Sequence, residues 1–150
     1  MKLSQNFALN EMLKSSAASK YKIKNIPNTE QLEYIKKLAT SVLQPIRDAF
    51  GSPIIIDSGF RSKELNKKVG GAQRSDHLYG AAVDIHTKSD TLTDNKKLWD
   101  LIIKLKDEGK ISCRQIIWER GNKNLGPSWI HISINNKWNS QKTNEILYIV

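Results

Sequence analysis

Two short stretches of the sequence carry side chains that could hold a metal ion. In the first, SDHLYGAAVD, His77 and Asp84 lie seven positions apart, with Gly80 and two alanines between them. A histidine at the end of a loop and a carboxylate on the following strand can converge on one ion, while small residues let backbone pass close by. In the second, WIHISI, His131 alternates with isoleucines, so a buried strand would direct it away from the aliphatic core.

Two histidines and one carboxylate form a suitable ligand set for a catalytic zinc ion. Three protein ligands leave the fourth tetrahedral position for water, whose pKa falls to about 7 on zinc, so that it becomes a nucleophile at neutral pH. The alternative is that His77 is a turn residue, Asp84 a buried hydrogen-bonding carboxylate and His131 a strand histidine with its own partner. Spacing alone does not decide between these interpretations.

The composition limits the kind of protein and the kind of site. With 150 residues, of which 39% are hydrophobic and 26% charged, the chain is typical of one domain with its own core. Cys113 is the only cysteine, so an intramolecular disulfide and a thiolate metal site are excluded. It has no local motif or histidine partner in its favour, so we do not expect a thiol nucleophile.

The charge and the terminal segments give further expectations. A formal net charge of +9 favours a polyanionic environment, which could be nucleic acid, an anionic membrane or the bacterial wall. The basic residues are scattered along the chain, so we expect a solvated cationic surface and no nucleic-acid partner. We find no signal peptide, no transmembrane run and no phosphate-binding glycine loop, which predicts synthesis in the cytoplasm and no nucleotide.

The helices and strands that must position His77, Asp84 and His131 can be predicted from the sequence. They indicate an α+β fold in a single domain over residues 1–150. Apolar spacing predicts a helix from Gln31 to Phe50, capped by Asn28 or Thr29 and interrupted at Pro45. Ser62 is expected to cap a shorter helix through Val69, and Thr93 or Asp94 to open one that closes at Gly109. The expected strands run over residues 53–57, 82–86, 114–119, 129–134 and 145–150. Residues 120–128 are expected to form a hairpin loop bordering a cleft, and residues 1–28 a helical flap or docking segment.

Several stretches resemble the D-alanyl-D-alanine carboxypeptidase family of zinc peptidases, specifically its small phage and prophage branch. They are SGFRS, GGAQRSDHLYGAAVDIH and WIHIS, and the likeness extends over most of the chain from about residue 3 to residue 133. The family signature S-x-H-x-x-G-x-A-x-D is matched at every fixed position by Ser75, His77, Gly80, Ala82 and Asp84.

This resemblance implies a fold shared with the hedgehog signalling domain. A small antiparallel sheet would carry one zinc ion on His77, Asp84 and His131, with helices packed on the sheet. The implied reaction is hydrolysis of a peptide bond in bacterial peptidoglycan, either in a stem peptide or in a cross-bridge. The protein would then be a D,D-carboxypeptidase or an endolysin-type endopeptidase that meets the cell wall after release or as part of a virion.

One position departs from the family pattern. Members that cut D-Ala-D-Ala have a catalytic glutamate three residues before the second ligand histidine, and this chain has Ser128 there. We expect Glu119 to replace it, because antiparallel pairing of QIIWE with WIHIS would bring it beside the metal; the alternative is an ion pair with Arg120. Arg61 resembles the family arginine that holds a peptide carboxylate or stabilises an oxyanion. Its alternative is an ion pair with Glu64.

Other residues near the site have two interpretations each. Ser75 would bind a substrate backbone or cap the turn. His86 shares a strand face with Asp84, so it would support the ligands or remain an exposed strand-end histidine. Trp118 and Trp129 would wall a cleft or belong to the core.

Two further functions remain open on the sequence alone. The missing glutamate at Ser128 supports a protein that keeps the metal and binds wall peptide without cutting it. The positive charge supports a phage structural or nucleic-acid-associated protein, which would bind DNA in a salt-dependent way and need no metal.

Overall fold

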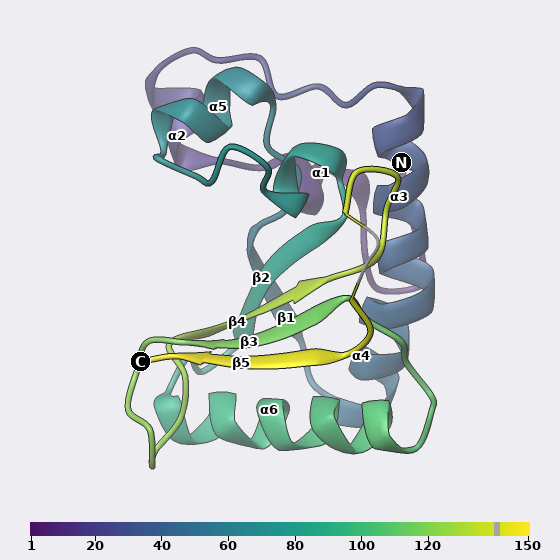
Figure 1. Ribbon diagram of the computed structural model, residues 1–150, viewed down its shortest axis with the longest axis vertical. Helices are drawn as coiled ribbons and strands as arrows, with labels where there is room; N and C mark the ends of the chain where they lie inside the picture. The colour runs from purple at the N-terminus through teal and green to yellow at the C-terminus, as the bar shows by residue number, and fades with distance from the viewer. Residues whose placement is uncertain (140–141) are drawn as a thin grey trace.

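The computed structural model describes residues 1–139 and 142–150 and has the predicted α+β fold, with one five-stranded sheet and helices packed on it (Figure 1). The strands are β1 (Ile54–Ser58), β2 (Ala82–Thr87), β3 (Gln115–Glu119), β4 (Trp129–Ser133) and β5 (Glu145–Ile149). The helices are α1 (Leu9–Leu13), α2 (Ser16–Lys20), α3 (Thr29–Leu38), the π-helical turn η1 (Ala39–Leu43), α4 (Gln44–Phe50), α5 (Lys63–Lys68), the 3-10 helix η2 (Asp76–Tyr79) and α6 (Leu92–Asp107).

The sheet has the strand order β1-β2-β4-β3-β5 and is antiparallel except at one edge. There β5 pairs with β3 in parallel, while the pairs that carry the candidate site, β1–β2, β2–β4 and β3–β4, are antiparallel as expected. The amide of Asn144 donates to the carbonyl of Cys113 and that of Glu145 to the carbonyl of Arg114. The strand therefore begins beside the start of β3 and runs in the same direction.

Alternation along the strands separates a core face from an open face. Ile116 and Trp118 of β3 are buried on the core face with Ile130 and Ile132 of β4, and α6 runs along this side (Figure 1). Trp118 packs edge-on against Trp99 of α6, with ring centroids 5.5 Å apart. Trp118 is therefore a core residue rather than a cleft wall. Each such side chain contributes roughly 1.5–3 kcal/mol by its burial.

The predicted helix over residues 31–50 forms as three consecutive segments. Asn28 caps α3 by accepting a hydrogen bond from the Gln31 amide (2.8 Å), and the Gln31 side chain accepts one from the Asn28 amide. The π-helical turn η1 follows, and Pro45, which has no amide hydrogen to donate to the preceding turn, lies at the second residue of α4. Gly51, with φ +74°, ends the helix as predicted.

Some boundaries differ from the sequence-based prediction. Thr91, not Thr93 or Asp94, caps α6 by accepting from the Asp94 amide (3.2 Å). β1 begins at Ile54 rather than at Pro53, whose nitrogen carries no hydrogen to donate to the ladder. Ser62 caps α5 as expected, accepting from the Leu65 amide (3.2 Å).

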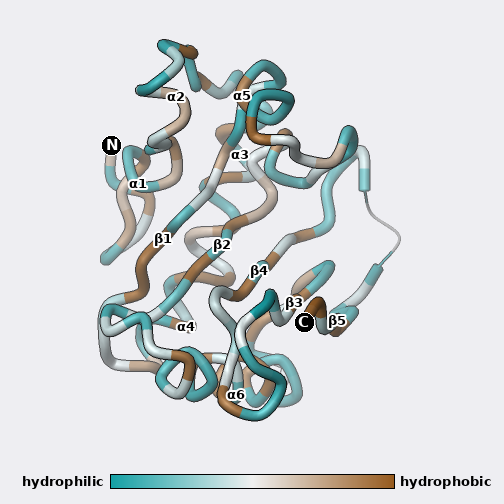
Figure 2. Tube along the Cα trace, turned by 90° about the vertical axis from the view of Figure 1, so that its left-hand side faces the viewer, coloured by the Kyte–Doolittle hydropathy of each residue, from teal (hydrophilic) through white to brown (hydrophobic). Residues whose placement is uncertain are grey.

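The N-terminal segment contributes to two apolar clusters. Phe7 and Met12 are buried in the main core. Ala18 and Ile23 instead form a small separate core with Leu65 of α5, and α2 lies beside α5 in both views (Figures 1 and 2). No helix in residues 1–139 or 142–150 is both long and apolar enough to cross a membrane.

Candidate metal centre

Asp84 and His131 lie opposite each other on neighbouring strands. The register of β2 against β4 pairs these two residues directly, so both side chains leave the sheet on its open face. Nδ1 of His131 lies 3.0 Å from Oδ1 of Asp84. The prediction from the alternation in WIHISI is therefore confirmed: Ile130 and Ile132 lie in the core, and His131 lies outside it.

His77 reaches the same point from η2 rather than from the sheet. The Ser75 hydroxyl caps this short helix by accepting from the His77 amide (3.2 Å). Gly80 ends it with φ +74°, and a Cβ there would lie 2.5 Å from the Gln31 carbonyl oxygen. Nε2 of His77 lies 3.4 Å from Oδ2 of Asp84. The contact made by Ser75 is that of a cap.

The hydrogen bond on the far side of the His77 ring fixes its tautomer. Nδ1 lies 2.7 Å from the carbonyl oxygen of Gly59, which can only accept, so Nδ1 carries the proton. Nε2 is then left with a lone pair directed at Asp84. This is the usual arrangement of a metal-binding histidine, whose second nitrogen donates to a backbone carbonyl.

The donor set fits zinc. One ligand atom from each of His77, Asp84 and His131 can be chosen such that all three lie within 4.8 Å of one another. Zinc bonds of about 2.1 Å in tetrahedral geometry place ligand atoms about 3.4 Å apart, close to the contacts of 3.0 and 3.4 Å that Asp84 makes with the two rings. Two imidazoles and a carboxylate are also the ligand types that zinc accepts.

The protonation states suit metal binding. Burial lowers the pKa of His77, which favours the neutral ring. Burial alone would raise the pKa of Asp84, but its contacts with the two histidine rings, that with His131 first, outweigh burial and hold that pKa well below its usual range. A neutral imidazole and an ionised carboxylate are the forms that coordinate a cation.

Arg61 lies beside this cluster with an uncompensated charge. Its amide donates to the carbonyl of His77 (3.0 Å), and its Nε is buried without a hydrogen-bond partner in the described residues. Burial lowers the pKa of Arg61, against the opposing effect of Asp84. The ion pair with Glu64 that we considered is not among those formed within residues 1–139 and 142–150. The guanidinium can therefore bind an incoming anion.

Glu119 lies at the end of β3 on the open face. It pairs with Trp129, and the next residue on that face, Ile117, pairs with His131, so Glu119 is the diagonal neighbour of His131, at roughly 7–8 Å between backbones. Burial raises the pKa of Glu119 against the opposing charge of His131. Among the described residues it forms no ion pair with Arg120.

Asp76, the residue before His77, has a role that the sequence did not indicate. Its Oδ2 lies 2.8 Å from a guanidinium nitrogen of Arg114, and its Oδ1 accepts from the side-chain amides of Asn136 and Asn139 at 2.9 Å each. Asp76 as a whole residue is 6% exposed, and both of its carboxylate oxygens accept hydrogen bonds. Asp76 thus ties η2 to Arg114, which directly precedes β3, and to the segment after β4.

His86 shares the open face with Asp84 but belongs to a separate network. Its Nε2 lies 3.0 Å from Oδ1 of Asp57, and its Nδ1 lies 3.3 Å from Oδ1 of Asp90. Both ring nitrogens therefore face oxygen acceptors other than the Asp84 carboxylate. His86 does not complete the donor set.

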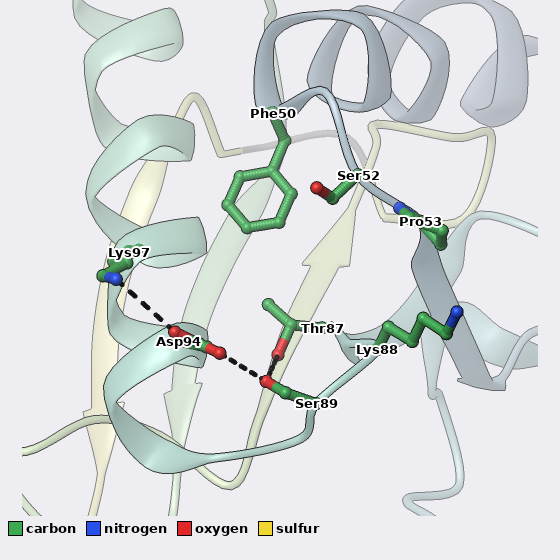
Figure 3. Close-up of a pocket in the computed structure, with 8 residues that line it drawn as sticks. All are labelled: Phe50, Ser52, Pro53, Thr87, Lys88, Ser89, Asp94 and Lys97. Atoms are coloured by element: carbon green, nitrogen blue, oxygen red, sulfur yellow. Dashed lines mark hydrogen bonds and ion pairs between the residues drawn. The ribbon is translucent and has the colours of Figure 1, made fainter.

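A cavity of about 640 Å³ lies away from these residues, between the end of α4 and the start of α6 (Figure 3). Its polar side chains bond one another, since Ser89 donates to Asp94 and Asp94 pairs with Lys97. None of the candidate site residues lines it. The candidate site residues therefore lie on and beside the open sheet face and not in this cavity.

Comparison with known proteins agrees with this arrangement. Residues 5–106 match the family model described as peptidase M15. A zinc D-Ala-D-Ala carboxypeptidase of Streptomyces albus G is 50% identical over 44 residues, which cover 29% of this chain and 17% of that protein's length. The family match contains Arg61, His77 and Asp84 but ends before Glu119 and His131. The case for the last two residues is therefore geometric.

The Asp76 network predicts a large effect of a single substitution. Asp76→Ala leaves the Arg114 guanidinium, whose side chain is 15% exposed, without its partner, which should lower the free energy of unfolding by about 3–5 kcal/mol. Asp100→Ala removes an exposed pair with Lys96 and should cost under about 1 kcal/mol. Urea denaturation of both variants measures the difference, and equal losses would contradict the assigned role of Asp76.

Proposed function

This chain belongs to the peptidase M15 family of zinc metallopeptidases, and we propose that it hydrolyses a peptide bond in bacterial peptidoglycan. The observation that carries the proposal is the convergence of His77, Asp84 and His131 within 4.8 Å on an open sheet face. Arg61, which forms no ion pair within residues 1–139 and 142–150, and the half-buried Glu119 adjoin them. A stem peptide or cross-bridge would lie along this face, where Trp129 offers an apolar contact.

We assign the metal to His77, Asp84 and His131. When bound, zinc lowers the pKa of a water molecule to about 7 and polarises a carbonyl group. The chain's own part is to hold these three donors in place, through the Gly59 carbonyl on one side of His77 and the β2–β4 register on the other. Cys113, the only cysteine of the chain, cannot by itself supply a closed thiolate site.

Glu119 and Arg61 take the two remaining roles. The Glu119 carboxylate accepts a proton from the attacking water and passes it to the leaving amine; its raised pKa makes it a stronger base than an exposed glutamate. Arg61 binds the peptide carboxylate or the oxyanion, because its charge has no carboxylate partner within ion-pair distance in the described chain. Glu119 thus supplies the function that Ser128 cannot.

Peptides ending in D-Ala-D-Ala are the first substrates to test, because the Streptomyces relative is a D-Ala-D-Ala carboxypeptidase by name. The resemblance to small phage members favours a role in wall degradation by a phage or prophage. Intact wall is therefore the second substrate, since an endopeptidase would cut cross-bridges that a short peptide does not contain.

A metal-binding protein without peptidase activity is the second candidate. The serine at position 128 favours it, because a serine side chain cannot act as the catalytic carboxylate expected there. In this case wall peptide would bind at Arg61 and remain uncut.

The central experiment is cleavage of purified peptidoglycan followed by mass spectrometry of the products. We expect new peptide ends that appear with the untreated protein, disappear after chelation and return when zinc is added, without nucleotide. A zinc-loaded protein that leaves every wall preparation unchanged would favour the second candidate.

The ligand assignment predicts which histidine the metal needs. His131→Ala removes one of three donors, so zinc content should fall from about one per chain to well below half under dialysis. His86→Ala is the matched control, because that ring contacts Asp57 and Asp90 instead, and its zinc content should remain near one. Full zinc in His131→Ala would refute the assignment.

The role of Glu119 is tested by Glu119→Gln, which keeps the shape of the side chain but cannot take up the proton. We expect zinc content and melting temperature to stay unchanged while kcat falls by about 10² to 10⁴. The control Glu33→Gln alters an exposed residue of α3 paired only with Lys36 and should leave kcat unchanged. Unaltered turnover in Glu119→Gln would reject its catalytic role.

A further inference from the structure

The positive charge of the chain is concentrated in one part of the structure. Residues 14–24 and 62–74, which we call the cationic lobe, contain eight basic residues and a single acidic one. Their net charge of +7 leaves only +2, of a total of +9, for the other 126 residues. The basic residues that are scattered along the sequence therefore gather in space. They are Lys14, Lys20, Lys22, Lys24, Lys63, Lys67, Lys68 and Arg74, and all eight are exposed.

The two segments of the cationic lobe form one unit. Ala18 and Ile23 from the first segment share a buried cluster with Leu65 of α5. The ammonium of Lys68 lies 4.2 Å from the centre of the Tyr21 ring, and that of Lys20 lies 5.3 Å from it. Figures 1 and 2 both show α2 beside α5 at one end of the molecule.

The basic side chains of the lobe have no ion-pair partners in the described residues, whereas several of those elsewhere do. Within residues 1–139 and 142–150, none of its eight basic side chains forms an ion pair. On α6, by contrast, Lys96 pairs with Asp100 and Lys97 with Asp94. A concentration of unpaired positive charge produces a potential that attracts polyanions.

The lobe also offers concave surface next to the metal centre. A cavity of about 360 Å³ is lined by Lys63 and Lys67, and one of about 500 Å³ by Lys63 and Arg74. The two share Lys63, Gln73 and Leu78, and no acidic residue lines either of them. Leu78 directly follows His77 in η2. A partner seated on the lobe would therefore lie beside the substrate of the metal centre.

We propose that the cationic lobe binds a polyol-phosphate polymer of the bacterial cell wall. The inference rests on the proposed function, because the partner must occur together with wall peptide. Phosphodiester groups along a flexible chain match cations that are spread over two segments. Single-stranded nucleic acid fits less well, since Tyr21 is the lobe's single aromatic residue and two ammonium groups already lie over its ring. Binding to the polymer would hold the protein on its substrate and raise its effective concentration there.

The test compares two variants that lose the same charge from different places. The lobe variant combines Lys24→Gln, Lys63→Gln and Lys67→Gln. The control variant combines Lys37→Gln, Lys104→Gln and Lys123→Gln, three exposed residues outside the lobe without ion pairs in the described structure. Melting temperature and zinc content establish that both variants are folded.

Binding is measured by titration with purified poly(glycerol phosphate). We expect the lobe variant to bind at least about tenfold more weakly than the original protein, and the control variant less than about twofold more weakly. The original affinity should fall on the order of tenfold or more between about 50 and 200 mM salt. Equal losses in the two variants would overturn the proposal, as would tighter binding to duplex DNA or to vesicles of anionic phospholipid than to the polymer.

The result of the polymer titration does not depend on whether the protein is an active peptidase. Polymer binding needs no cleavage, so a protein that binds the polymer but never cuts wall peptide would contradict the proposed function alone. An active peptidase without affinity for the polymer would contradict this inference alone.

Discussion

The register of β2 against β4 is the constraint on which the metal centre depends. Because side chains alternate across a strand, a slip of one residue would turn His131 into the core and bring an isoleucine opposite Asp84. Ile85, Ile130 and Ile132 are fully buried on the other face, and a slip would expose them. The free energy of apolar burial on one side of the sheet therefore fixes the distance between two polar groups on the other.

His77 is held by a different kind of interaction, since it does not belong to the sheet. Its helix, η2, is anchored by the buried Asp76–Arg114 pair and by the approach of Gly80 to α3. The Gly59 carbonyl then sets the rotation of the ring. Sheet pairing positions two of the candidate ligands, and a polar network positions the third. Mutations in the strands should therefore displace Asp84 and His131, whereas changes around η2 should displace His77.

The sequence allowed prediction of the parts that depend on local periodicity. Alternation in WIHISI placed His131 outside the core, and Asn28, Ser62 and Gly51 marked helix ends by their own backbone chemistry. Contacts between distant residues were not predictable in this way. Arg114 and Asp76 are 38 positions apart, and nothing in either neighbourhood indicates the other. The cationic lobe was missed for the same reason, because its two segments meet only through the small core around Leu65. Thr91 could have been found, since it lies three residues before an acidic residue of the first helical turn.

The single thiol of the chain bears on how the protein tolerates different redox surroundings. Cys113 is 2% exposed, and burial raises the pKa of its thiol to about 12, so almost no thiolate is present at neutral pH. The buried thiol therefore offers almost no thiolate to attack a disulfide or to cross-link two molecules. Cys113 is accordingly expected to stay a free thiol in both reducing and oxidising surroundings. The same property suits the chain to a single spectroscopic label, because a cysteine introduced at exposed Leu125, on the loop that joins β3 to β4, would be the sole reactive thiol.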